Sequence, residues 1–388
     1  MCDVMIELLW LLLPVAAASG WLTAWLTYRQ GPTNSSWSPD YLKGLNYLLN
    51  EEPDKALDVF IKLIEVDNDT VETHLSLGVL FRRRGEVNRA IRIHQNLIAR
   101  PTLLPQQRNL ALFELAQDYH HAGLLDRAEE LFQELVASQT HQVLALRQLL
   151  DIYQQEHDWV KAIRTAKQLA SANHKSMHTE IAQYYCEQAE VHLKQKQDDA
   201  ARQAIQYALK TDSSCVRASL LEGQLALSQG NLKQAILAFK RVEQQEPDYL
   251  IETLEPLQTC YQALGKPSEF INYLHKVLQT HGGIRPMLML ATLIKQQDSE
   301  QQAADFIALQ LHKQLSLRGF DYLLDLALSK TAAILTIDHL LSLKTLTRQL
   351  LKNEPAYKCD HCGFMARNLH WQCPSCKQWN TLKPRQEE

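Results

Sequence analysis

The chain has 388 residues, 46% of them hydrophobic, which is enough for two or three domains or for one elongated array. Its 40 basic and 44 acidic residues give a formal net charge of −4, which argues against a general nucleic-acid-binding surface. Only 13 Gly and 13 Pro occur, beside abundant Leu, Ala and Gln, and this composition favours helix throughout. We therefore expect an all-α fold and no nucleic-acid partner.

An uncharged apolar stretch, LLWLLLPVAAASGWLTAWL, occupies residues 8–26. As a helix rising about 1.5 Å per residue it would be roughly 28 Å long, close to the hydrocarbon thickness of a bilayer. Aromatic residues near its two ends resemble interfacial anchors: Trp10, Trp21, Trp25 and Tyr28. The sequence therefore predicts a transmembrane anchor within residues 1–29, followed by a short linker over residues 30–38.

A cleaved signal peptide is the alternative interpretation, because VAAASG offers small residues at a plausible cleavage site. Asp3 and Glu7 precede the apolar run, however, where a signal peptide carries basic residues. Arg29 and Lys43 follow it, so the positive-inside rule places the C-terminal bulk of the chain in the cytoplasm. We expect an uncleaved single-pass protein of the inner membrane.

Small residues recur at an offset of twelve through the middle of the chain. Successive units begin 34, 38, 34, 39 and 34 residues apart, which is typical of tetratricopeptide repeats, where small residues let two antiparallel helices approach closely. The six pairs are Gly44 with Ala56, Gly78 with Ala90, Ala116 with Ala128, Leu150 with Ala162, Ala189 with Ala201, and Gly223 with Ala235. Two further units, without the glycine, centre on Leu257 with Glu269 and on Ala291 with Ala303. We predict a repeat superhelix over residues 39–315, whose concave face binds another protein, and terminal helices over 316–355.

Other patterns in the repeats suggest little chemistry. His174 and His178 lie one helical turn apart, but Lys175 stands where a metalloprotease helix needs Glu, so we interpret both as loop or surface residues. The run Arg82–Arg84 is interpreted as a solvated helix end, with contact to anionic lipid as the alternative. The sequence contains neither a phosphate-binding glycine loop nor a nucleophile elbow, and we expect no enzymatic activity.

Four cysteines near the C-terminus form two Cys-x-x-Cys pairs in CDHCGFMARNLHWQCPSC. Cys359, Cys362, Cys373 and Cys376 have the spacing of a tetrahedral site with four thiolate ligands, which selects zinc or a single iron. Gly363 supplies the positive φ that such a turn needs. With four protein ligands no coordination position is open for water or substrate, so the site is predicted to be a structural clip.

Other roles for the cysteines are less consistent with their spacing. Two redox-active disulfides are the alternative for the terminal four, and His361 is not needed as a ligand. Lys358, Arg367 and Lys377 can offset the negative charge of four thiolates around a divalent metal. The remaining cysteines, Cys2, Cys186, Cys215 and Cys260, are scattered, and the last three are expected to be buried free thiols.

The order of parts resembles the lipopolysaccharide assembly protein B (LapB) family of Gram-negative bacteria over essentially the whole chain. The specific feature is the tail YKCDHCGFMARNLHWQCPSCKQWNTLKP, which in that family is described as rubredoxin-like. The resemblance implies a small rubredoxin-like domain over residues 356–388, holding one iron or zinc ion. It also implies a non-enzymatic adaptor that helps the membrane protease FtsH degrade the deacetylase LpxC. Other lipopolysaccharide assembly proteins, and a second copy of the chain, are further partners that it suggests.

The sequence is also compatible with two functions other than the adaptor. The loop between the cysteine pairs is far shorter than in true rubredoxins, and Lys377 stands where a second glycine is usual. A rubredoxin-like electron carrier would nevertheless use the same four cysteines. A generic membrane-anchored scaffold for envelope assembly would use the same anchor and repeats.

Overall fold

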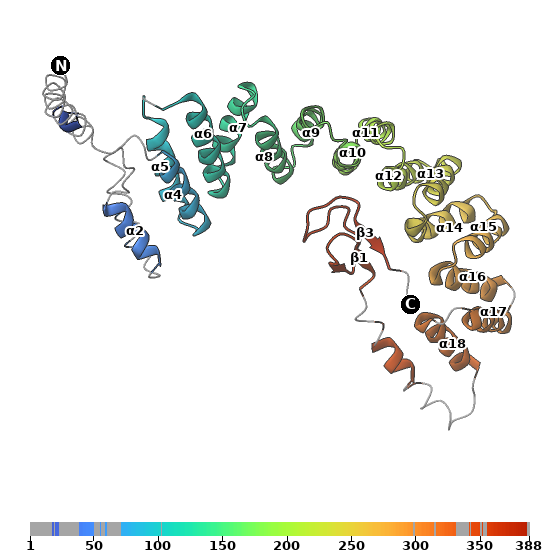
Figure 1. Ribbon diagram of the computed structural model, residues 1–388. Coiled ribbons are helices and arrows are strands. Elements are labelled where there is room, and N and C mark those ends of the chain that lie inside the picture. The colour runs from blue at the N-terminus through green and yellow to red at the C-terminus, as the bar shows by residue number, and fades with distance from the viewer. Residues whose placement is uncertain are drawn as a thin grey trace, which may run out of the picture. The chain divides into compact units, whose positions relative to one another are not determined.

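The computed structural model describes most of the chain as helices followed by a small sheet (Figure 1). The described residues are 18, 20–22, 39–49, 55, 59, 71–101, 103–297, 299–313, 316–330, 341, 343–349, 351 and 355–385. They belong to two compact units, Met1–Leu124 and Leu125–Glu388, here called unit 1 and unit 2. Each unit is described by itself.

Unit 1 contains four described helices. They are α2 (Pro39–Leu49), α4 (Val71–Arg83), α5 (Val87–Ile98) and α6 (Pro105–His121). Helix α5 packs against both α4 and α6. The apolar contact between them is made by side chains such as Val71, Leu75, Leu97 and Ala111, which form one buried cluster.

Unit 2 contains the remaining helices, which pack in consecutive pairs (Figure 1). They are α7 (Leu125–Ala137), α8 (Gln142–Gln155), α9 (Trp159–Asn173), α10 (His178–Lys194), α11 (Asp198–Thr211), α12 (Val216–Ser228), α13 (Leu232–Gln245), α14 (Leu254–Ala263), α15 (Pro267–Thr280), α16 (Ile284–Gln297), α17 (Glu300–Lys313) and α18 (Leu317–Lys330). A short 3-10 helix, η2 (Pro247–Glu252), separates α13 from α14, and Pro247 ends the preceding helix as the sequence predicts.

The predicted small residues lie where the helices pack most closely. Each alanine that the twelve-residue offset assigns to a second helix is fully buried, from Ala90 to Ala303, and Ala56 lies outside the described residues. A Cβ built on Gly78 would lie 2.3 Å from the His94 ring, and one on Gly223 would lie 2.5 Å from the Phe239 ring. Any larger side chain at these glycines would push the paired helices apart. The tetratricopeptide register is therefore confirmed in five of the six predicted pairs, from Gly78 with Ala90 to Gly223 with Ala235, and in the pair Ala291 and Ala303.

The seventh unit differs from the prediction by one residue. Glu269 is exposed, and Phe270, only 2% exposed, occupies the buried position instead. The turn residue Gly265 lies eight positions after Leu257, whereas Gly230 lies seven positions after Gly223. This extra residue rotates α15, so the assignment of Glu269 to the helix contact is wrong.

The turns inside six of the described repeats, from α4–α5 to α14–α15, have the same backbone conformation. One residue adopts a positive φ, and the next N–H donates back to a carbonyl five residues earlier, as for Asn231 and Ala226 at 2.8 Å. The positive-φ residues are Gly85, Gly123, His157, Lys196, Gly230 and Gly265. In two repeats, His157 and Lys196 replace the glycine that this conformation favours.

The arginine run at the end of α4 is only partly solvated. Arg83 and Arg84 are exposed as expected, but the Arg82 side chain is 8% exposed and donates to Asp118 at 2.7 Å and to Glu114 at 2.6 Å. Asp118 is fully buried and also contacts His94 Nδ1 at 2.5 Å. The interpretation of Arg82 as solvated is therefore wrong: it joins α4 to α6 inside unit 1.

The C-terminal part of the chain forms a small antiparallel sheet, so the fold is mostly helical and not entirely α. Strands β1 (Tyr357–Cys359), β2 (Met365–Ala366) and β3 (Leu382–Pro384) lie in the order β2-β1-β3. Tyr357 pairs with Ala366 on one side and with Pro384 on the other. We call residues 355–385 the C-terminal module.

The predicted membrane anchor and the predicted terminal helices after α18 are only partly described. Ala18, Gly20, Trp21 and Leu22 are helical, and the rest of the predicted anchor over residues 8–26 lies outside the described residues. Within the part of the chain that the structure describes, none of the helices has the length and apolar character to span a bilayer. After α18, residues 341, 343–349 and 351 are helical.

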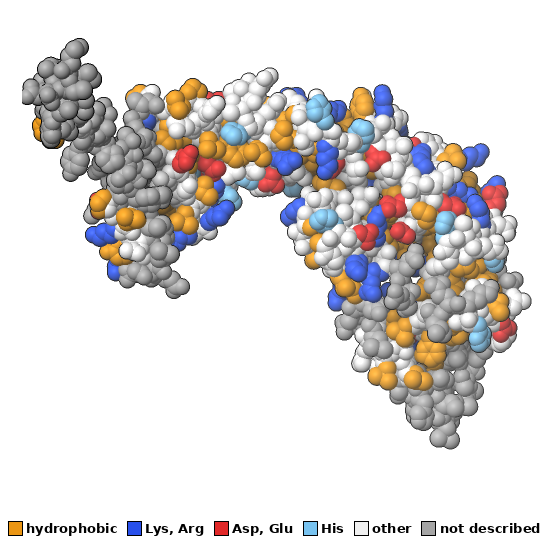
Figure 2. All heavy atoms as spheres, in the orientation of Figure 1, with side chains coloured by type: hydrophobic (Ala, Val, Ile, Leu, Met, Phe, Trp, Pro, Cys, Tyr) orange, Lys and Arg blue, Asp and Glu red, His pale blue; other side chains and the backbone are white. Residues whose placement is uncertain are grey.

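Charged side chains of both signs are interspersed on the surface. Figure 2 shows Lys and Arg beside Asp and Glu over the face of unit 2 that it presents. The exposed histidines include His174 and His178, which confirms their interpretation as loop or surface residues. Cys186, Cys215 and Cys260 are buried free thiols, also as predicted.

Candidate metal centre

Two turns of nearly identical structure hold the four cysteines. In the first, the Gly363 N–H donates to the Cys359 carbonyl at 2.8 Å, and in the second the Lys377 N–H donates to the Cys373 carbonyl at 2.9 Å. Gly363 and Lys377 both have positive φ, 76° and 59°. The sequence predicts this conformation for Gly363, and the structure shows that Lys377 adopts it as well.

The two turns bring four sulfur atoms together. All four Sγ atoms lie within 4.8 Å of one another, with Cys359 to Cys376 at 3.8 Å and Cys362 to Cys373 at 3.7 Å. A tetrahedral ion with metal–sulfur bonds of about 2.3 Å requires sulfur atoms about 3.8 Å apart. The donor set therefore fits one tetrahedral metal ion, and these distances are too long for disulfide bonds. His361 is exposed and is not part of this cluster.

Hydrogen bonds to sulfur favour the thiolate at one cysteine. Burial opposes ionisation of Cys359, but the Thr381 hydroxyl, 3.3 Å from its Sγ, and the backbone N–H groups of Cys362 and His361 lower its pKa to about 6. At Cys376 the Gln378 N–H favours the thiolate, whereas burial and the neighbouring thiols raise the pKa. The side chains of Lys358, Arg367 and Lys377 are exposed around the cluster.

The C-terminal module packs against the repeats of unit 2 through aromatic side chains. The Trp371 ring stacks on Tyr249 of η2, with ring centroids 5.5 Å apart, and Arg217 of α12 lies 5.9 Å from the Trp371 centroid. The Tyr249 hydroxyl donates to the Leu382 carbonyl at 2.7 Å. Burial raises the pKa of Tyr249, so the hydroxyl keeps the proton that it donates.

A second contact lies nearer the second cysteine turn. Trp379 packs edge-on against Tyr184 of α10, with ring centroids 5.7 Å apart. Trp379 Nε1 and Gln372 Nε2 both donate to Gln154 Oε1 of α8, at 3.4 Å and 3.2 Å. This contact therefore joins the second cysteine turn to two different repeats.

Polar groups on the strands of the module complete the interface. The Tyr357 hydroxyl of β1 donates to Glu252 at 2.7 Å, and Lys383 of β3 forms an ion pair with Glu246. Lys383 also lies over the Tyr249 ring. The module is thus held by helices α8, α10 and α12 and by η2.

The repeat residues in this interface were not identified as functional from the sequence. They are Gln154, Tyr184, Arg217 and Tyr249. Their contacts join residues that are far apart in the sequence: Tyr249 and Asn380 are separated by 131 residues, and Gln154 and Trp379 by 225. The available signal was the density of aromatic residues beside the cysteines, namely Trp371 and Trp379. Without knowledge of the fold, that signal does not identify the repeat residues that the tryptophans contact.

Comparison with known proteins agrees with this architecture. A family model described as a rubredoxin metal binding domain matches residues 357–384, and two tetratricopeptide repeat models match residues 73–107 and 186–249. Lipopolysaccharide assembly protein B of Escherichia coli (strain K12) is 39% identical over 98% of this chain and 98% of its own length. The protein of the same name from Haemophilus influenzae is 37% identical, again over 98% of each chain. The repeats, the cysteine module and this identity along the full length show that the chain belongs to the lipopolysaccharide assembly protein B family.

Proposed function

We propose that this protein is a non-enzymatic adaptor in lipopolysaccharide assembly, anchored in the inner membrane with its repeats in the cytoplasm. In this proposal it limits lipopolysaccharide synthesis by presenting the deacetylase LpxC to the membrane protease FtsH. The observation that carries the proposal is the identity to lipopolysaccharide assembly protein B over 98% of both chains. The partners FtsH and LpxC come from the family resemblance.

The form of the molecule supports an adaptor. Tetratricopeptide repeats bind other proteins through extended surfaces, and here the C-terminal module fills part of the repeat surface in unit 2. A client would therefore meet repeats and module together. The apolar segment at residues 8–26 would confine this surface near a membrane protease and raise its effective concentration.

We further propose that Cys359, Cys362, Cys373 and Cys376 bind a single iron or zinc ion with a structural role. When bound, the metal supplies the cross-link between the two cysteine turns. A module of about thirty residues has too small a core to hold its shape alone, so metal binding is coupled to its folding. Four cysteine ligands would leave no open position for substrate.

The direct test is the half-life of the deacetylase in cells. Deleting the gene should lengthen the half-life, and the wild-type gene should restore it. The double variant Cys359→Ser, Cys376→Ser should not restore it, whereas His361→Ala, which alters an exposed residue in the same turn, should. An unchanged half-life in the deletion strain would exclude the proteolytic role and leave a generic scaffold.

A redox function makes a different prediction in a reconstituted degradation assay. If the metal only holds the module, protein loaded with zinc and protein loaded with iron should support degradation equally. Activity confined to the iron form would instead favour the rubredoxin-like electron carrier.

A further inference from the structure

Two buried cysteines of the repeats lie in contact with each other. Cys186 belongs to α10, and Cys215 directly precedes α12, a helix that packs against α10. The two Sγ atoms are 3.8 Å apart, and the residues are 0% and 3% exposed. A disulfide bond requires sulfur atoms about 2.05 Å apart, so the two free thiols need to approach by less than about 2 Å to form one.

The surroundings of Cys215 favour its thiolate. Cys215 is the N-cap residue of α12, and the thiol of Cys186 donates to its sulfur, which lowers the pKa of Cys215 against the effect of burial. The backbone N–H of Ala218 and the guanidinium group of Arg217 lower this pKa further. Cys215 also directly follows an exposed loop residue, Ser214, so the reactive sulfur lies close to the surface in the chain.

The other two buried cysteines of the repeats have different surroundings. Burial raises the pKa of Cys186, so this residue keeps its proton next to the Cys215 thiolate. Burial also raises the pKa of Cys260. Within the described part of the chain, no second thiol is hydrogen-bonded to Cys260. The pair therefore combines a reactive thiolate with a neighbouring thiol, and Cys260 offers an isolated buried thiol for comparison.

We propose that Cys186 and Cys215 are an oxidation site, which a hydroperoxide converts to a disulfide bond. The Cys215 thiolate attacks one oxygen of hydrogen peroxide and becomes a sulfenic acid, and the other oxygen leaves as hydroxide and takes up a proton to give water. The sulfur of Cys186 then attacks the sulfenic sulfur, and the Cys186 proton leaves with the hydroxyl group as a second water. The two sulfur atoms lose two electrons in total, and the peroxide gains them. A dithiol reductant restores both thiols by exchange.

The thiol pair is connected to the surface on which the C-terminal module docks. Gln183 Nε2 donates to Cys215 Sγ at 3.8 Å, and Gln183 Oε1 accepts a hydrogen bond from Arg217 at 3.3 Å. Arg217 also donates to Glu190 at 2.5 Å and lies 5.9 Å from the ring centroid of Trp371 in the module. Closing the disulfide moves the sulfur that Gln183 contacts, so Gln183 and Arg217 must readjust beneath Trp371.

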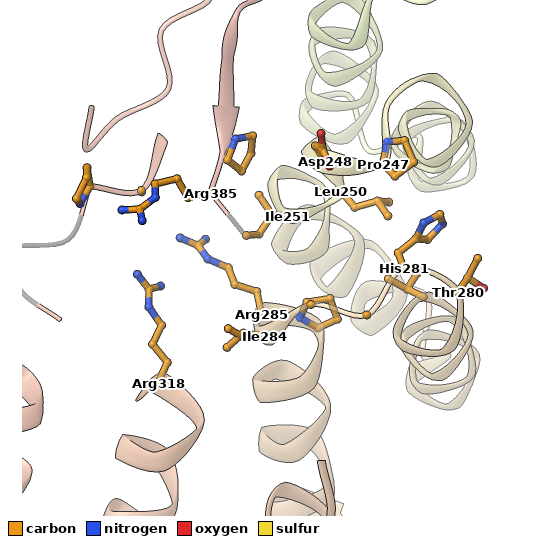
Figure 3. A pocket seen from close by; sticks show the side chains of 17 residues that line it. Pro247, Asp248, Leu250, Ile251, Thr280, His281, Ile284, Arg285, Arg318 and Arg385 are labelled. Carbon is orange, nitrogen blue, oxygen red and sulfur yellow. The ribbon is translucent and has the colours of Figure 1, made fainter. Parts of the chain in front are cut away.

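The contacts with α10 and α12 matter because the module is not closely packed on every side. A cavity of about 690 Å³ lies between residues 384–385 of the module and the starts of α16 and α18. Figure 3 shows Arg285, Arg318 and Arg385 around this open space. Docking therefore depends on the contacts with α8, α10, α12 and η2, and we expect oxidation of the thiol pair to weaken it. This inference concerns cysteines outside the metal centre and does not depend on the proposed role in proteolysis.

The first test maps the bond in the full, metal-loaded chain. The protein is treated with hydrogen peroxide, unfolded in the presence of an alkylating reagent, digested with trypsin and analysed by mass spectrometry. We expect peptides 176–194 and 211–217 to be joined with the loss of two hydrogen atoms, and dithiothreitol to separate them. Cys260 should remain alkylated and is the internal control. Absence of the joined peptides, or equal oxidation of Cys260, would overturn the proposal.

Single variants test the order of the two steps. Cys186→Ser keeps a hydroxyl donor beside Cys215 but removes the second thiol, so Cys215 should accumulate as a sulfenic acid that dimedone labels. Cys215→Ser should leave Cys186 unlabelled, because its thiol stays protonated. Cys260→Ser is the matched control and should form the disulfide as the wild type does. Labelling of Cys186 but not of Cys215 in these variants would contradict the assignment of Cys215 as the nucleophile.

Limited proteolysis tests the link to docking. Peroxide should accelerate cleavage of the C-terminal module in the wild type more than in Cys215→Ser, because the variant cannot form the disulfide. Both proteins contain the four cysteines of the metal centre, so direct oxidation of that centre affects them alike. Equal acceleration in both would show that the disulfide does not act on docking and would overturn that part of the proposal.

Discussion

The two cysteine turns differ at one residue that matters for their stability. Gly363 and Lys377 occupy equivalent positions, and both have positive φ. Glycine adopts this conformation without strain, whereas an L-residue such as Lys places its Cβ too close to the following carbonyl oxygen. The second turn therefore carries backbone strain that the first does not. Lys377 is exposed, so its side chain can be removed without opening a cavity.

Replacing Lys377 with glycine should stabilise the C-terminal module. The expected gain is about 0.5–1 kcal/mol, because relief of the left-handed strain exceeds the added entropy of the unfolded chain. Unfolding by a chelator, followed by tryptophan fluorescence, measures it. The control is Lys358→Gly, at an exposed position of β1 with no positive φ, which should destabilise the module. If both substitutions change the stability of the module in the same direction, relief of strain at Lys377 does not explain the effect.

Single residues also show why sequence reasoning reached only part of the structure. The four cysteines were identifiable because ligand spacing is local in the chain. Arg82 was misjudged because its partner Asp118 lies 36 residues further along, and a local run of arginines contains no information about it.

At the scale of helices, the repeat register was predictable because it depends on side-chain volume. At the closest approaches, such as Gly78 and Gly223, only a small residue fits, and such residues leave a period in the sequence. The twelve-residue period wrongly assigns Glu269 to the helix contact, because one extra residue before Gly265 rotates α15. A count of twelve residues cannot detect such an insertion, whereas the turn can: the buried residue lies five positions after the positive-φ residue, as for Gly230 and Ala235.

Enlarging a buried alanine should destabilise the repeat that contains it. Ala235→Leu or Ala90→Leu would add volume at a fully buried helix contact, and we expect a loss of roughly 1–3 kcal/mol. Because neighbouring repeats stabilise one another, hydrogen exchange should also rise in the adjacent units. Ala263→Leu, at an exposed position on α14, is the matched control and should change little. Equal melting curves for Ala235→Leu and Ala263→Leu would contradict the packing.

At the scale of the whole molecule, docking of the C-terminal module links the metal site to the repeats. Trp371 and Trp379 lie in the module between or beside the cysteines, and both pack on tyrosines of the repeats. Under the proposed structural role of the metal, we expect the module to position these rings only while its two cysteine turns are held together. Metal binding, the shape of the module and its contact with Tyr249 and Tyr184 should therefore be lost together. The sequence could not show this, because the contacts join distant parts of the chain.

Removing one cysteine from each turn tests that coupling. Cys359→Ser with Cys376→Ser should release the metal, because only two thiolates remain, and the free energy of metal binding is folding free energy for so small a module. We expect the fluorescence of Trp371 and Trp379 to shift toward that of solvent-exposed indole and the module to become protease-sensitive. Circular dichroism should show the helices retained, since unit 2 has its own apolar core around Phe239, Leu257 and Leu274. Tyr249→Phe separates the two steps: it removes the hydrogen bond to Leu382, so docking should weaken by about 1 kcal/mol while the metal stays bound. If the double serine variant keeps its tryptophans buried and its module resistant to protease, the module folds and docks without metal and the structural role assigned to the four cysteines is wrong.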